Sequence, residues 1–257
     1  APRLSLYLKD LFMPRPRTLV ASLDNGLDLQ LHSSTRPHVG KIAALQKGLV
    51  LVQDGQALIE EGYGFGLPII EANGVAYMSR RAETSLVGRG GQLTLVKAYQ
   101  IDVADRPTRP FRVKYADVAP LGTVIFSYTI RTPHTIDVIV DFTRLATEWD
   151  RAYLMNEQGA RAFTRYVRPD GKALDASEVG IWEATTAPFG CWEAPARAVR
   201  FCVEADQGQP GFVGRERYRQ YNWLGFYTLS WSGIDIAVQA PLDTYSYTIR
   251  VQGDVKE

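Results

Sequence analysis

The chain has 257 residues, of which 46% are hydrophobic and 22% charged, the balance of an ordinary soluble globular protein. Its 29 lysines and arginines nearly cancel its 28 aspartates and glutamates, and a net charge of +1 gives no field that would hold nucleic acid or an anionic membrane. No stretch approaches the roughly 18 apolar residues of a membrane-spanning helix. We therefore expect no nucleic-acid partner and no membrane span. The sequence leaves the oligomeric state open. It also leaves the compartment open, cytoplasmic or exported, because no signal peptide is present to decide it.

Most of the chain consists of short runs of alternating apolar and polar residues, separated by turn signals. Three of the turns carry Asn25-Gly26, Asp54-Gly55 and Asn73-Gly74. Such dipeptides between alternating runs are the strongest local signal of β-hairpins, so they predict an antiparallel meander. The glycine-rich segment 62–66 lacks the lysine of a phosphate loop, and we expect a bend or bulge where backbones approach closely.

Strand-like runs continue to the end of the chain, which predicts an all-β fold. Two short helices are predicted, over 4–12 and 143–154, because apolar residues recur there every four positions. A proline-marked break at 106–110 is the only seam, and we interpret it as a loop. Residues 1–257 are therefore expected to form one large antiparallel β-sandwich domain.

The two cysteines, Cys191 and Cys202, allow two interpretations. In an exported chain they could cross-link the arms of a hairpin, and closing so short a loop would contribute about 3 kcal/mol if the stabilisation is entropic. Alternatively, they are two buried thiols in neighbouring strands. No CxxC, HExxH or GxSxG pattern occurs, so we expect no metal, no cofactor and no serine nucleophile.

The three histidines differ in their surroundings. His32 and His38 lie in a polar segment and are expected to be solvated. His134 follows a proline and shares its strand face with apolar residues, which makes it the candidate catalytic acid or base. Asp137 and Asp141 fall on the other face of that strand, about 13 Å apart by strand rise, too far for an acid/base pair, and are expected to face solvent.

The stretch from Gly214 to Trp231 combines arginine with aromatic residues. Read as one extended run, it places one set of residues on a single face, because side chains alternate along a strand. The candidate ligand-binding residues in this set are Arg215, Arg217, Arg219, Tyr221, Trp223 and Tyr227. Such a stripe suits sugar rings or anionic ligands, through stacking and bidentate guanidinium contacts. It equally suits a sheet interior with a polar end, and four of the five tryptophans lie past residue 180, in a binding wall or a heavier core.

The N-terminal order of strands and turn glycines, with NGLDLQL at 25–31, GKIAAL at 40–45 and GLVLV at 48–52, resembles the opening of galactose-mutarotase-like supersandwich proteins. That group includes sugar epimerases and domains of polysaccharide lyases and glycoside hydrolases. The resemblance implies a supersandwich-like fold and, by analogy, sugar chemistry. The family's catalytic pair is a mid-chain histidine and a late carboxylate. No motif for it is matched here, although His134 and Glu216 occupy comparable places along the chain.

Three functions follow from these patterns. The first is a carbohydrate-interacting β-sandwich protein that clamps a saccharide on the arginine and aromatic stripe. The second is an epimerase or polysaccharide-lyase-like enzyme on the same scaffold, with His134 or a tyrosine as the proton carrier. The third is a non-catalytic structural or interaction protein in which the stripe is ordinary sheet packing.

Overall fold

The computed structural model describes residues 3–5, 18–33, 45–59, 63–89, 92–109, 112–175, 182–185, 189–205, 213–223 and 227–253. The backbone alone is described at 3–5, 89, 106–109, 112–115, 175, 182–185, 213–223 and 227–231. Within these residues, no helix has the length and hydrophobicity that a membrane crossing needs.

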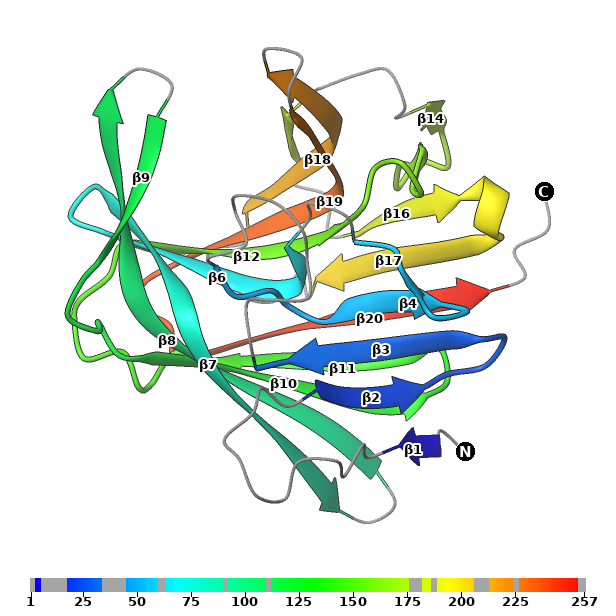
Figure 1. Cartoon of the computed structure of the whole chain (residues 1–257), viewed down its shortest axis with the longest axis horizontal. Coiled ribbons are helices and arrows are strands. Elements are labelled where there is room, and N and C mark those ends of the chain that lie inside the picture. Colours follow the sequence, from blue (N-terminus) through cyan, green and yellow to red (C-terminus); the bar gives the residue numbers. More distant parts are fainter. Residues whose placement is uncertain are drawn as a thin grey trace.

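The described strands form two antiparallel sheets (Figure 1). The five-stranded small sheet contains, in order, β1 (Arg3–Ser5), β2 (Thr18–Ser22), β3 (Leu27–His32), β4 (Val50–Gln53) and β5 (Gln56–Ala57). The fifteen-stranded large sheet has the order β14-β13-β16-β17-β20-β11-β10-β8-β7-β6-β12-β19-β18-β15, with β9 paired to β8. All-β architecture is thereby confirmed.

The strands of the large sheet have these bounds: β6 (Gly64–Ala72), β7 (Val75–Arg89), β8 (Gln92–Arg109), β9 (Arg112–Asp117), β10 (Thr123–Thr132), β11 (Thr135–Asp141), β12 (Arg151–Gln158), β13 (Arg165–Val167), β14 (Ala173–Asp175), β15 (Trp182–Thr185), β16 (Phe189–Ala194), β17 (Val199–Ala205), β18 (Val213–Trp223), β19 (Tyr227–Gln239) and β20 (Thr244–Gly253). A 3-10 helix, η2 (Pro195–Arg197), joins β16 to β17.

The three hairpin turns predicted from the sequence are confirmed by their backbone angles. Asn25, Asp54 and Asn73 have φ of 59°, 49° and 51°, and the glycine after each also has positive φ. A two-residue turn with positive φ at both positions twists in the sense that the flanking strands need. Local chemistry therefore sets β2–β3, β4–β5 and β6–β7 as hairpins.

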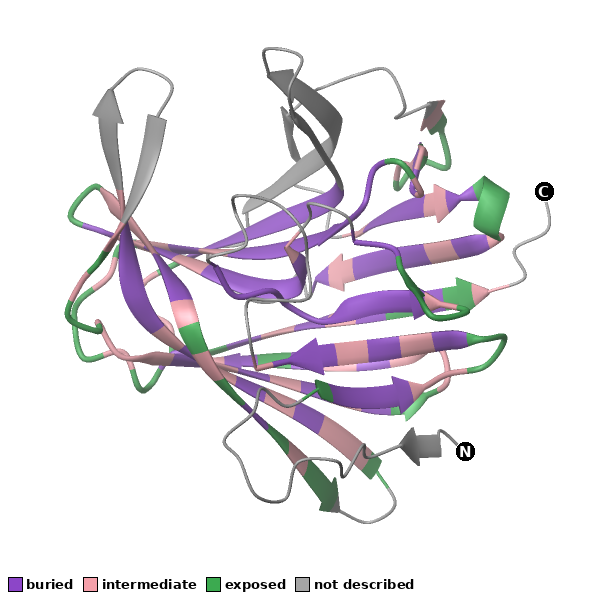
Figure 2. Cartoon of the chain, in the orientation of Figure 1, coloured by how far each residue is buried: buried purple, intermediate pink, exposed green. Residues whose placement is uncertain are grey.

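The core lies between the two sheets, where buried side chains of the small sheet pack against those of the large one. Figure 2 shows the buried residues along the strands of both sheets. In β3, Leu27, Leu29 and Leu31 are almost completely buried, while Asp28 and Gln30 between them are partly exposed. Across from them, the rings of Tyr99 and Phe126 meet edge to face with centroids 5.5 Å apart. One apolar face per sheet is what the alternating pattern predicts for a sandwich.

Close backbone approach explains the glycines around segment 62–66, as expected. A Cβ on Gly48 would lie 2.1 Å from the carbonyl oxygen of Phe65. Gly66 has a φ of +82°, and a Cβ there would lie 2.3 Å from the Tyr128 hydroxyl. Side chains at these positions would push β6 away from its neighbours.

Two sequence expectations about secondary structure are wrong. Residues 142–150 form turns and bends, and β12 begins at Arg151, so no helix covers 143–154. In addition, β8 continues through the proline-marked segment to Arg109 and pairs with β9, so the strand is not interrupted there. Of the expected helix over 4–12, the first residues belong to β1, and 6–12 lie outside the described residues. A single domain over 1–257 stays a prediction.

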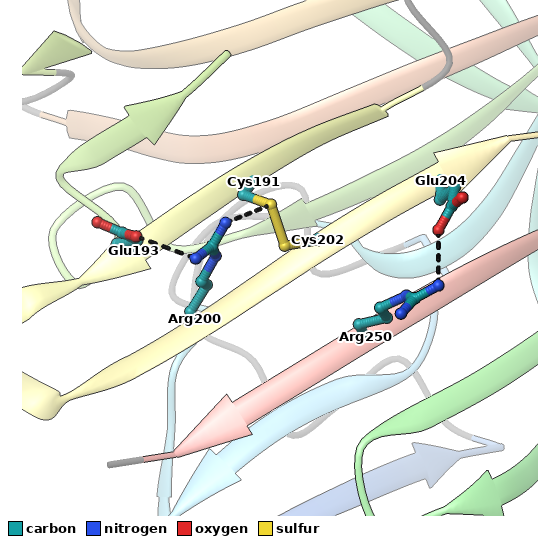
Figure 3. Close-up of a disulfide and its surroundings, with 6 residues drawn as sticks. All are labelled: Cys191, Glu193, Arg200, Cys202, Glu204 and Arg250. Carbon is teal, nitrogen blue, oxygen red and sulfur yellow. Dashed lines mark hydrogen bonds and ion pairs between the residues drawn. A yellow bond between two sulfur atoms is a disulfide. The ribbon is translucent and has the colours of Figure 1, made fainter. Parts of the chain in front are cut away.

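The two cysteines form a disulfide, so the interpretation as free thiols is wrong (Figure 3). Cys191 of β16 and Cys202 of β17 are direct cross-strand partners, with Cα atoms 4.0 Å apart. The bond therefore cross-links the two arms of a hairpin, the first of the two sequence interpretations.

Candidate functional site

The arginine and aromatic stripe lies on a hairpin, not on one extended strand as the sequence predicted. β18 ends at Trp223 and β19 begins at Tyr227, and the two strands pair with Trp223 opposite Tyr227. In this register, odd-numbered residues of β18 pair with odd-numbered residues of β19. The residues predicted from the sequence to lie on one face therefore still share one face of the hairpin. The candidate residues Arg215, Arg217, Arg219, Tyr221 and Trp223 occupy alternate positions of β18. Their side chains lie outside the described part of the chain, and their role stays a prediction.

Two buried carboxylates lie beside the arginine end of this hairpin. Asp235 of β19 is 2% exposed and is the direct partner of Arg215. Glu157 of β12 is 0% exposed and is the direct partner of Gly233, which in turn pairs with Arg217. Neither carboxylate is without an interaction partner. A buried carboxylate is stabilised by a nearby positive charge or by hydrogen bonds, and the register places one arginine position beside each of these two carboxylates.

Gly233 allows β19 to lie close to β12 at this point. A Cβ on Gly233 would lie 1.9 Å from the carbonyl oxygen of Asn156 and 2.7 Å from the Cα of Glu157. Glycine is therefore required between the Glu157 and Arg217 positions. Because glycine has no side chain, none stands between the Glu157 and Arg217 positions, which are neighbours of Gly233 on either side in the register.

Sequence reasoning missed a buried lysine at the contact between the two sheets. Lys97 of β8 is 0% exposed, and its Nζ donates hydrogen bonds to the carbonyl oxygens of His32 (2.6 Å) and Lys47 (2.5 Å). The Nζ also lies 4.9 Å from the centre of the Tyr99 ring. Burial lowers the pKa of Lys97 well below its usual value, because the low-dielectric interior disfavours the charged form. The sequence did carry a signal for this burial: Lys97 lies two residues from both Leu95 and Tyr99, so it shares the apolar face of the strand with them.

Buried tyrosines extend this polar network through the core. Tyr128 donates to the carbonyl oxygen of Phe65 at 2.8 Å, and Tyr247 donates to Oδ1 of Asn156 at 2.9 Å. Burial raises the pKa of both tyrosines well above the usual value, because it disfavours the phenolate. These hydroxyls satisfy buried polar groups and join strands that are distant in sequence, a structural role.

His134, the candidate catalytic residue, lies in the turn between β10 and β11. Its Nδ1 is 3.1 Å from the carbonyl oxygen of Val251, to which it can donate, and its Nε2 is 3.9 Å from Oδ2 of Asp24. The side chain is 44% exposed, and six strands separate β11 from β18 in the order of the sheet. The structure thus does not bring His134 next to the hairpin along the sheet, and its catalytic role stays a prediction.

Other predicted residues fall in varied places. His32 is buried rather than solvated, and its Nδ1 lies 2.8 Å from Oγ1 of Thr18, while His38 lies outside the described residues. Trp192 is fully buried and stacks on Phe201 with centroids 5.1 Å apart, so this late tryptophan belongs to the core. Among the described residues, no group of three or more histidine, cysteine, aspartate or glutamate side chains could hold a metal ion.

Comparison with known proteins finds likeness of fold. No protein-family model matches the chain, and no curated protein matches it in sequence. An α-N-acetylgalactosaminidase from Bifidobacterium bifidum, in complex with GalNAc, superposes with a TM-score of 0.58 at 7% identity over 92% of this chain. Heparan sulfate lyase HepC from Pedobacter heparinus gives a TM-score of 0.50 at 8% identity over 93%. This chain spans 36% of the length of each of these two structures.

An Escherichia coli protein whose name marks it as a suspected aldose 1-epimerase gives a TM-score of 0.48 at 10% identity, covering 93% of this chain and 100% of that one. At these identities the likeness establishes the fold alone. The resemblance expected from the N-terminal strands is therefore confirmed as one of fold. The chain is a large antiparallel β-sandwich of the kind found within sugar-active enzymes.

Proposed function

We propose that the chain is a carbohydrate-binding β-sandwich protein whose ligand lies along the β18–β19 hairpin. The proposed contacts are Arg215, Arg217, Arg219, Tyr221, Trp223 and Tyr227. The observation that carries the proposal is the register of this hairpin, which sets arginine positions at one end of the row and an aromatic pair at the other. The likeness of fold to two sugar-active enzymes supports it by analogy.

The arginine end of the row supplies hydrogen-bond donors for sugar hydroxyls. Asp235 and Glu157 are buried carboxylates that a positive charge would stabilise, and Arg215 and Arg217 are the arginine positions next to them in the register. A guanidinium has five N–H donors, so one that is held by a carboxylate keeps donors for a ligand. The buried carboxylates would thus fix the orientation of the arginines without neutralising their capacity to bind.

The tip of the hairpin supplies an apolar platform. Trp223 and Tyr227 are direct cross-strand partners, and such partners have Cβ atoms about 4.5–5.5 Å apart. A Trp–Tyr pair offers a wide, flat surface on which the C–H face of a sugar ring can stack, with polar tips that reach hydroxyls. Donors at one end and a stacking surface at the other are the two things that saccharide recognition needs.

The test is a glycan-binding screen read by tryptophan fluorescence and thermal shift, with neutral and uronic-acid oligosaccharides side by side. A bound ligand raises the stability of the native state, and we expect a hit to quench tryptophan as well. We expect Tyr221→Ala to weaken binding of that hit by about tenfold or more, a change of about 1.4 kcal/mol. The matched control is Tyr218→Ala, which removes the same residue type from the other set of positions on β18. Equal affinity in the wild type and Tyr221→Ala would refute the proposal and favour ordinary sheet packing.

An enzyme on this scaffold is a second candidate, favoured by the orientation of His134. The carbonyl of Val251 holds Nδ1, which leaves Nε2 as the nitrogen directed towards Asp24 and available for proton transfer. Turnover assays on any sugar identified in the screen, with the wild type and His134→Ala, distinguish binder from enzyme. Turnover that His134→Ala abolishes would support the catalytic role, and turnover that it leaves unchanged would remove it.

A further inference from the structure

The outward face of the large sheet contains a groove lined by strands other than β18 and β19. It has a volume of about 1000 Å³ and crosses β16, β17, β20 and β11. Its wall includes the ionisable residues Arg131, Asp137, Glu204 and Arg250, and two apolar side chains, Ile139 and Phe189. A groove of this size can hold several rings of a small ligand.

One cross-strand row of lining residues runs across the groove. Phe189 pairs with Glu204, Glu204 with Thr248, and Thr248 with Asp137, each as a direct partner on the next strand. Direct partners lie on the same face of a sheet, and neighbouring strands are about 4.8 Å apart. The row therefore extends about 14 Å across the strands, with an aromatic ring at one end and carboxylates along it. This shape fits an extended ligand that lies across the sheet.

Each charge in the groove has an opposite charge beside it. Arg131 holds Asp137 with two contacts, Nη2 to Oδ1 at 2.7 Å and Nε to Oδ2 at 2.5 Å. Arg250 donates from Nη2 to Oε2 of Glu204 at 3.0 Å (Figure 3). Both arginine side chains are 52% exposed, and the carboxylates are 32% and 45% exposed. The groove thus carries two cations and two anions and attracts neither polyanions nor polycations.

Paired charges of this kind still recognise neutral polar groups. A guanidinium with one carboxylate partner keeps N–H donors, and a carboxylate keeps acceptor positions. Half-exposed ion pairs give both at fixed positions along the row, which matches the many donor–acceptor hydroxyls of a sugar. The half-buried ring of Phe189 and the side chain of Ile139, which is 49% exposed, offer apolar surface to the C–H faces of sugar rings.

We propose that this groove binds a neutral oligosaccharide, as a site separate from the β18–β19 hairpin. The inference does not depend on the proposed function, because it rests on other strands and other residues. The Cys191–Cys202 disulfide supports the groove: it cross-links β16 and β17, which carry Phe189 and Glu204, and Cys202 is the direct partner of Arg250 (Figure 3).

The experiment measures binding by isothermal titration of cellohexaose, maltohexaose and chitohexaose as neutral probes, with hexagalacturonate as the charged probe. We expect at least one neutral probe to bind, and Arg250→Ala and Phe189→Ala each to weaken it tenfold or more. The matched control is Arg80→Ala, which removes an arginine of β7 that also pairs with an exposed carboxylate, Asp117, but lies outside the groove. The expected affinity changes little with salt, because no net charge is neutralised.

Several outcomes would overturn the inference. These are failure of all three neutral probes to bind, binding that Arg250→Ala and Phe189→Ala leave unchanged, and preference for hexagalacturonate with a steep loss in salt. A concentration-dependent dimer that Ile139→Asp disrupts, without sugar binding, would assign this face to a second copy of the chain instead. Trp223→Ala keeps the two sites distinguishable: it should remove the hairpin site and leave binding in the groove intact.

Discussion

The buried amino group of Lys97 makes a pH-dependent contribution to stability that a single substitution can isolate. The side chain is 0% exposed, its Nζ contacts two backbone carbonyls and the Tyr99 ring, and no carboxylate among the described residues accepts a hydrogen bond from it. Burial lowers the folded-state pKa of Lys97 well below the 10.5 of an exposed lysine. Between these two pKa values, the unfolded chain holds a proton that the folded chain has released, so a rise in pH favours the folded state.

The magnitude follows from one proton per molecule. Where Lys97 is neutral in the folded state and charged in the unfolded state, the free energy of unfolding rises by about 1.4 kcal/mol per pH unit. The effect ends at pH 10.5, above which the lysine is neutral in both states. The buried tyrosines act in the opposite sense above pH 10, because their raised pKa values make the unfolded chain lose its protons first. The informative range is therefore about pH 7 to 9.5.

The assay is urea unfolding, followed by tryptophan fluorescence, of the wild type and Lys97→Met at several pH values in that range. We expect the free energy of unfolding of the wild type to rise with pH relative to that of Lys97→Met, because methionine cannot titrate. Lys172→Met, which removes an exposed lysine, is the control and should run parallel to the wild type. A constant difference between the wild type and Lys97→Met from pH 7 to 9.5 would refute the reasoning.

Three further predictions concern the fold. Replacing Cys191 and Cys202 together with serine should lower the free energy of unfolding by about 3 kcal/mol in urea, since the bond closes a loop of sequence separation 11; no loss would contradict the entropic estimate. Gly233→Ala should destabilise the protein by about 1–3 kcal/mol or more, because its Cβ would clash with the backbone of Asn156. Gly88→Ala is the control and should be neutral or slightly stabilising, because nothing lies within 4 Å of its Cβ. Equal Tm values for the two variants would argue against the tight approach of β19 to β12. Calorimetry should show one transition, with equal calorimetric and van't Hoff enthalpies, if residues 1–257 form one domain, and two separate transitions would exclude it.

The sequence was most informative where the structure depends on neighbours along the chain. Asn25-Gly26 and its two counterparts specify hairpin turns because asparagine, aspartate and glycine tolerate positive φ. Alternation identified the buried leucines of β3 for the same reason, since it reports a local period. Both signals are short-range, and both were confirmed.

Local patterns misled where one spacing fits two structures. Trp149 and Tyr153 are four residues apart, which puts them on one side of a helix and equally on one side of a strand. The expected helix over 143–154 failed for that reason, and Trp149 instead stacks on Phe142 with centroids 5.0 Å apart. The stripe was misread as one strand in a similar way, although Gly225, between the ends of β18 and β19, was an available turn signal.

The rest depends on contacts between strands that are distant in sequence. Asp137 was expected to face solvent, and it does lie on the outer face, but Arg131 and Thr248 surround its carboxylate there. Glu204 and Arg250 come together because β17 pairs with β20, a neighbour relation that no turn or periodicity announces. A groove that crosses four strands can be recognised only after the order of the sheet is known.

The most direct test of the central claim is a crystal structure of the chain with the best saccharide from the glycan screen. We expect density for the sugar along the β18–β19 hairpin, with a ring against Trp223 or Tyr227 and hydroxyls within hydrogen-bond distance of Arg217 or Arg219. A saccharide bound elsewhere, with these side chains packed into the interior of the sheet, would contradict the proposed site and support the structural interpretation of the stripe.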